Sequence, residues 1–166
     1  GLDVLTHATE AYVSVLANDF TDGLALQAIK LVFEHLERSV KDKDPEAREK
    51  MHNASTMAGM AFANAFLGMN HSLAHKIGGR FHTPHGRTNA VLMPHVIRYN
   101  GTRPQNGNVA KIQLLQSGCE IPRYRAYARF TLCHTRRTGE NPFAQACYDL
   151  AIRVGIKMSF KEQGID

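Results

Sequence analysis

The 166-residue sequence predicts an all-α domain, and three observations lead to this fold class. Apolar residues recur at helical spacing along most of the chain up to Tyr99. Helix-start signals separate these stretches, and no stretch shows the alternation of apolar and polar residues that a half-buried strand requires. The length fits one domain with a hydrophobic core, and no apolar run is long enough to cross a membrane. We therefore expect a single helical domain over residues 1–166.

Three helices are expected in the first part of the chain. The first covers residues 2–17, and the second runs from a turn, with Thr21 as its N-cap, to about Val40. The third begins at Asp44, because this residue is followed by Pro45 and then by an acid, which is a strong helix-start pattern. The alanines of the third helix would let a neighbouring helix approach closely.

A histidine-rich stretch follows the third helix. His71 and His75 are four residues apart, so they share one face of a helix. We expect Gly78 and Gly79 to end that helix, and His85 to project from a rigid turn between Pro84 and Gly86.

The last apolar stretch before residue 100 contains a proline. Residues 87–99 are expected to form two helical pieces joined at Pro94, because proline removes a helix hydrogen bond and crowds the preceding turn.

Four residues of these segments are candidate metal ligands. Asp3 and His7 are four apart on the first predicted helix, so a carboxylate and an imidazole can reach one cation. With His71 and His85 they would supply one oxygen and three nitrogens, which suits Fe(II) or Zn(II). The site could be structural and closed, or catalytic with room for a substrate oxygen. His75 is left over, and beside a metal-bound oxygen it would be a natural proton relay.

Long motifs of the chain resemble the iron-dependent (group III) alcohol dehydrogenases. The resemblance is greatest to the alcohol dehydrogenase half of the bifunctional aldehyde–alcohol dehydrogenases. The matching motifs are residues 3–12, 59–65, 71–76, 84–86 and 89–90.

This resemblance implies a two-domain enzyme that transfers hydride between a primary alcohol or aldehyde, such as ethanol or acetaldehyde, and NAD(H). An N-terminal α/β nucleotide-binding domain, absent here, would bind NAD(H), and this helical domain would be a piece truncated at both ends. The positions that match Asp3, His7, His71 and His85 bind the metal in that family. The position that matches His75 lies beside the nicotinamide and the reacting oxygen, which gives it a catalytic and a cofactor-binding role. The full-length protein is expected to be a cytoplasmic homo-oligomer.

The segment 105–139 departs from the family pattern. The net charge of +5 comes wholly from residues 103–140, which hold seven Lys or Arg and two Asp or Glu. Codons permitted for residues 110–116, read in a frame shifted by one base, give Pro-Lys-Tyr-Asn-Tyr-Tyr, which resembles the family's usual sequence. We interpret 105–139 as a frameshifted and poorly ordered segment. The alternative is a basic loop that binds polyanions; we expect no nucleic-acid and no membrane partner.

Two further observations bear on the cellular compartment and on competing functions. The three cysteines form neither a disulfide framework nor a Cys-x-x-Cys metal motif, which favours the cytoplasm. A helical metal-dependent phosphohydrolase would need a second acidic cluster near the histidines, but no Asp or Glu occurs between Glu49 and Glu120. A non-catalytic helical fragment or decayed gene product is the remaining alternative.

Overall fold

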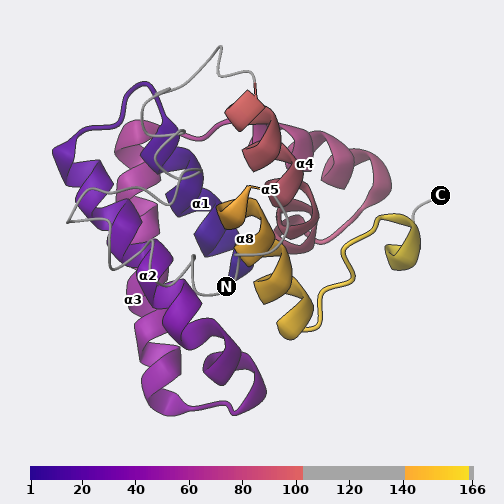
Figure 1. The fold of residues 1–166 in the computed structure, drawn as a ribbon, viewed down its shortest axis with the longest axis horizontal. Coiled ribbons are helices and arrows are strands. Elements are labelled where there is room, and N and C mark those ends of the chain that lie inside the picture. The colour runs from indigo at the N-terminus through magenta and orange to yellow at the C-terminus, as the bar shows by residue number, and fades with distance from the viewer. Residues whose placement is uncertain (103–140, 165–166) are drawn as a thin grey trace.

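A computed structural model describes residues 1–102 and 141–164, and every regular element in these two ranges is helical (Figure 1). The all-α expectation is therefore confirmed. The segment 105–139, interpreted from sequence as frameshifted, lies outside the described residues. In chain order the elements are α1 (Leu2–Val13), α2 (Asp19–Lys41), α3 (Pro45–Ala65), α4 (Met69–Phe81), α5 (His85–Thr102), α8 (Pro142–Arg153) and the 3-10 helix η1 (Lys161–Gln163).

Helices α2 and α3 form a long pair, and α1 packs against both (Figure 1). The close approach of α3 is explained by its buried face, which consists of alanines at intervals of three or four residues. These are Ala54, Ala58, Ala61 and Ala65. Helix α5 packs on α1, α4 and α8, so that α4 and α5 lie beside the first three helices. Helix α1 thus contacts most of the other helices.

The connection between α1 and α2 differs from its prediction. Helix α1 ends at Val13 rather than at residue 17, and the N-cap of α2 is Asn18, not Thr21. Oδ1 of Asn18 accepts hydrogen bonds from the backbone N–H groups of Phe20 (3.0 Å) and Thr21 (3.2 Å). Oγ1 of Thr21 accepts from the N–H of Asn18 (2.9 Å) in return. This reciprocal capping box places the helix start three residues earlier than Thr21 alone would.

The N-cap predicted for α3 is confirmed. Oδ1 of Asp44 accepts a hydrogen bond from the N–H of Ala47 at 2.9 Å, and Pro45 occupies the first helical position.

The glycine pair does not end α4, so that prediction was wrong. The helix continues through Gly78 and Gly79 to Phe81, and His82 ends it in the left-handed conformation (φ 53°). Glycine weakens a helix interior by only about 1 kcal/mol relative to alanine, which contacts with neighbouring helices can offset. His85 is accordingly not a loop residue but the first residue of α5.

Pro94 lies inside α5, which is one continuous helix rather than the two predicted pieces. Proline removes one backbone donor, but packing of α5 against α1, α4 and α8 holds both halves in place.

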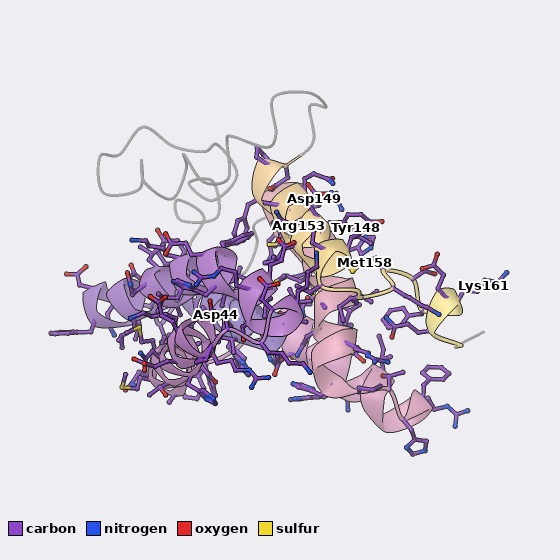
Figure 2. The ribbon with its side chains drawn as sticks, turned by 90° about the horizontal axis from the view of Figure 1, so that it is seen from below. Asp44, Tyr148, Asp149, Arg153, Met158 and Lys161 are labelled. Carbon is purple, nitrogen blue, oxygen red and sulfur yellow. The ribbon has the colours of Figure 1, made fainter. Side chains whose placement is uncertain are left out.

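Helix α8 docks on the core through Phe143, Cys147 and Leu150, which are at most 1% exposed. Nε of Arg153 lies 3.7 Å from Oε2 of Glu37 and links α8 to α2, whereas Lys161 points away from the helices (Figure 2). Among the described residues, no helix is both long and apolar enough to pass through a lipid bilayer.

Candidate metal centre

Three helices bring the four predicted ligands to one place. Helix α1 carries Asp3 and His7, α4 carries His71, and α5 carries His85. Asp3 lies at the centre of the group: its Oδ1 is 3.6 Å from Nε2 of His71 and 3.6 Å from Nε2 of His85. Its Oδ2 is 3.8 Å from Nδ1 of His7. The i, i+4 spacing read from sequence therefore does place Asp3 and His7 side by side.

The donor atoms converge rather than point to separate surfaces. One donor atom each of Asp3, His7 and His71 lies within 4.8 Å of the other two. The ring of His7 stacks on the ring of His71, with centroids 4.3 Å apart, and His71 and His85 have centroids 5.4 Å apart. On its other side His7 stacks on Phe62 at 4.6 Å. The structure thus brings together all four residues, while their binding of a metal remains a prediction.

Sequence reasoning missed Glu10, whose carboxylate touches this group. Oε2 of Glu10 is 2.6 Å from Nδ1 of His71, and Oε1 accepts a hydrogen bond from the N–H of Asn70 at 2.7 Å. The residue is only 7% exposed. A signal was present in the sequence, because Asp3, His7 and Glu10 are the carboxylate and imidazole residues of α1 and follow helical spacing on one face of it.

Two buried asparagines complete the surroundings of Asp3. Nδ2 of Asn89 donates to Oδ1 of Asp3 at 2.6 Å and lies 3.1 Å from Nε2 of His85. Nδ2 of Asn70 donates to Oδ1 of Asn89 at 2.9 Å. These amides connect α4, α5 and α1 by hydrogen bonds and fix the orientation of the Asp3 carboxylate.

The electrostatics of the group favour negative charge on Asp3 and positive charge near it. Burial alone would raise the pKa of Asp3, but the attraction of the His71 imidazole 3.6 Å away, the hydrogen bond from Asn89, and the imidazoles of His7 and His85 lower it to about 2. Burial opposes charging of His71, yet the carboxylates of Asp3 and Glu10 outweigh it and raise its pKa to about 9. Burial lowers the pKa of His7, and Asp3 only partly offsets this effect. The site therefore has a strong preference for a cation beside Asp3.

The residues present fit a divalent transition metal. Within the described residues, Nε2 of His71 is buried and has no hydrogen-bond partner, although its ring is held from the other side by Glu10. A buried polar atom without a partner costs free energy unless a ligand satisfies it. This nitrogen faces a carboxylate oxygen and lies near two further imidazoles, and that donor set suits Fe(II) or Zn(II).

His75 lies at the outer edge of the group. It is exposed, whereas His71, one turn earlier in α4, is 2% exposed. Its ring is 5.2 Å from that of His85, in a stacked arrangement, and 6.1 Å from that of His71. His75 is thus placed where it contacts both the cluster and solvent.

Comparison with known proteins shows to which family the chain belongs. The sequence model described as the Fe-containing alcohol dehydrogenase family, C-terminal, matches residues 1–166. The chain belongs to this family. The resemblance read from the motifs is thereby confirmed, and the phosphohydrolase alternative is dropped because the whole chain matches a family of oxidoreductases.

Several curated relatives and solved structures that match the chain are named as alcohol dehydrogenases. The aldehyde-alcohol dehydrogenase of Streptococcus pneumoniae is 60% identical over the full chain and over 19% of its own length. The bifunctional aldehyde-alcohol dehydrogenase of Escherichia coli is 62% identical over 60% of the chain and 11% of its own length. The solved alcohol dehydrogenase of Oenococcus oeni, 33% identical, superposes with a TM-score of 0.76 over 99% of the chain and 40% of its own. The chain thus spans about a fifth of the length of the curated relatives with full coverage.

Proposed function

We propose that this chain is the metal-binding part of an NAD(H)-dependent alcohol dehydrogenase that interconverts a primary alcohol and its aldehyde, such as ethanol and acetaldehyde. The observation that carries the proposal is the convergence of Asp3, His7, His71 and His85, with Nε2 of His71 buried and unpartnered among the described residues. Membership of the iron-containing family supports the reaction class, and the names of the relatives support the substrate class.

Asp3, His7, His71 and His85 would hold Fe(II), or Zn(II) in its place. The bound ion would supply a Lewis acid that polarises an alcohol or aldehyde oxygen. The protein keeps the inner side of the cluster dry, because His71 is 2% exposed and Glu10 is 7% exposed. The outer side, with His75 and the 43% exposed side chain of His85, is the face open to a substrate.

His75 would act as the proton relay and would contact the nicotinamide end of the cofactor. A neutral imidazole has one nitrogen that can accept a proton, so His75 can take the alcohol proton and pass it to water. Its exposure and its contact with the ring of His85 support this role. The hydride acceptor NAD would be bound by an N-terminal nucleotide-binding domain, as part of a cytoplasmic homo-oligomer.

The test joins this chain to the nucleotide-binding half of the protein and follows NADH-dependent reduction of acetaldehyde at 340 nm after loading with Fe(II) or Zn(II). We expect turnover with one ion per chain, and its loss in Asp3→Asn and His71→Ala. His95→Ala removes an exposed imidazole from α5 and serves as the matched control, with unchanged turnover.

Two results would contradict the proposal. A complete protein that binds one ion at these residues but reduces no aldehyde would leave only a structural metal site. A complete protein that binds no ion would favour the decayed gene product.

A further inference from the structure

We propose that Glu10 is the positioning residue that fixes the ring of His71 with Nδ1–H toward α1 and Nε2 toward the metal. This inference rests on the proposed metal site. It does not depend on the substrate or on NAD(H), because it concerns how one ligand is oriented before the ion binds.

The first step is the hydrogen-bond chemistry of the carboxylate. Oε2 of Glu10 lies 2.6 Å from Nδ1 of His71, and both groups are buried. An ionised carboxylate only accepts hydrogen bonds, so Nδ1 must carry the proton. In the neutral ring, Nε2 then has the free lone pair, which is the nitrogen found 3.6 Å from Asp3. Carboxylates that accept from the second nitrogen of a histidine ligand orient metal sites in this way.

The second step concerns the backbone of α4. Asn70 and His71 lie in its first turn, where backbone N–H groups have no partner within the helix, and the N-cap Gly68 offers no side-chain cap. Glu10 supplies the missing acceptors from α1: Oε1 accepts from the N–H of Asn70 at 2.7 Å, and Oε2 accepts from the N–H of His71 at 3.4 Å. One carboxylate therefore fixes both the start of the helix and the ring that the helix carries.

The third step is the lack of a substitute acceptor. In Glu10→Gln the side chain keeps its size but has one oxygen and one NH₂ group. If the oxygen keeps the N–H of Asn70, the NH₂ donates to Nδ1 of His71 and the ring proton moves to Nε2, which can then no longer bind a metal. If the oxygen instead accepts from Nδ1–H, the NH₂ faces the N–H of Asn70 and two donors collide.

The experiment measures the Zn(II) affinity of the full chain by competition with a chelator, and the melting temperature by circular dichroism. Loss of such a supporting partner lowers metal affinity about 10–100-fold, and we expect this for Glu10→Gln. The matched control is Glu34→Gln, which removes the same charge from an exposed position of α2 and should leave the affinity unchanged. Wild-type affinity in a folded Glu10→Gln variant would overturn the proposal.

A second measurement needs no variant and so decides the matter even if Glu10→Gln fails to fold. In the ¹⁵N spectrum of the Zn(II)-loaded wild-type chain, His71 should coordinate through Nε2 and keep a slowly exchanging proton on Nδ1. Coordination through Nδ1, or no Zn(II) bound at His71, would overturn the proposal. If the chain shows the expected His71 signals but the complete protein has no dehydrogenase turnover, the proposed function is refuted and the role of Glu10 stands.

Discussion

His71 and His75 show how one turn of helix separates two chemical roles. Both are on α4, but His71 is buried against Glu10 and Asp3, whereas His75 is exposed. A buried imidazole with one nitrogen fixed is suited to hold an ion, because its geometry is set in advance. An exposed imidazole can exchange protons with water, which a relay requires.

His75→Ala should therefore remove turnover without removing the metal. We expect a loss of roughly 10²–10⁴-fold in turnover number, the range typical of a lost general acid–base group, at an unchanged metal content. Metal stoichiometry by atomic spectroscopy and steady-state kinetics on the complete protein measure the two quantities. His71→Ala is the matched comparison, because it should lose both. Loss of metal from His75→Ala would show instead that His75 is a ligand.

The sequence predicted the candidate ligands but not the residues that support them. Asp3 and His7 were identifiable because a ligand pair at i, i+4 is visible in one helix. Three supporting residues act between helices: Glu10, Asn70 and Asn89. Their roles depend on how α1, α4 and α5 face one another, and the spacing of residues within one helix does not show this arrangement. For the same reason, the spacing of residues in α3 could not show that the ring of Phe62 stacks on His7.

At the scale of elements, the sequence predicted where helices occur better than where they end. Asp44 and Pro45 marked the start of α3 correctly, since a cap is a local interaction. The predicted helix end at Gly78 and Gly79 and the predicted break at Pro94 were wrong, because packing on neighbouring helices overrides weak local preferences. The consequence for the site is that His85 begins a helix, and a helix orients its side chain more firmly than a loop.

The start of α4 gives a test at this scale. A Cβ added at Gly68 would lie 2.8 Å from Oε1 of Glu10, and φ at Gly68 is −125°, so the obstacle is the carboxylate rather than the backbone. Gly68→Ala should destabilise the fold by roughly 1–3 kcal/mol, as overpacking does, and should weaken Zn(II) binding by displacing Glu10. Chemical denaturation and the chelator competition measure these effects.

Gly59→Ala is the matched control for that change. Gly59 lies inside α3, and an added Cβ would meet nothing within 4 Å. Here alanine should stabilise the fold by about 0.5–1 kcal/mol and leave Zn(II) binding unaltered. Equal behaviour of the two variants would mean that Glu10 does not need the space beside Gly68.

At the scale of the whole molecule, α1 joins the core to the candidate site. Leu5 and Tyr12 are fully buried in the core formed with α2 and α3, while Asp3, His7 and Glu10 of the same helix face α4 and α5. The position of the ligands therefore depends on the packing of the whole helical domain, and the site is built on rigid elements rather than on loops.

The most direct test of this account is the location of the ion itself, by anomalous X-ray diffraction at the iron or zinc edge from crystals of the metal-loaded protein. The account predicts one strong peak per chain, within roughly 2.0–2.2 Å of a carboxylate oxygen of Asp3 and of one nitrogen each of His7, His71 and His85. A peak elsewhere, a peak that one of these four residues does not reach, or no peak after loading would contradict it.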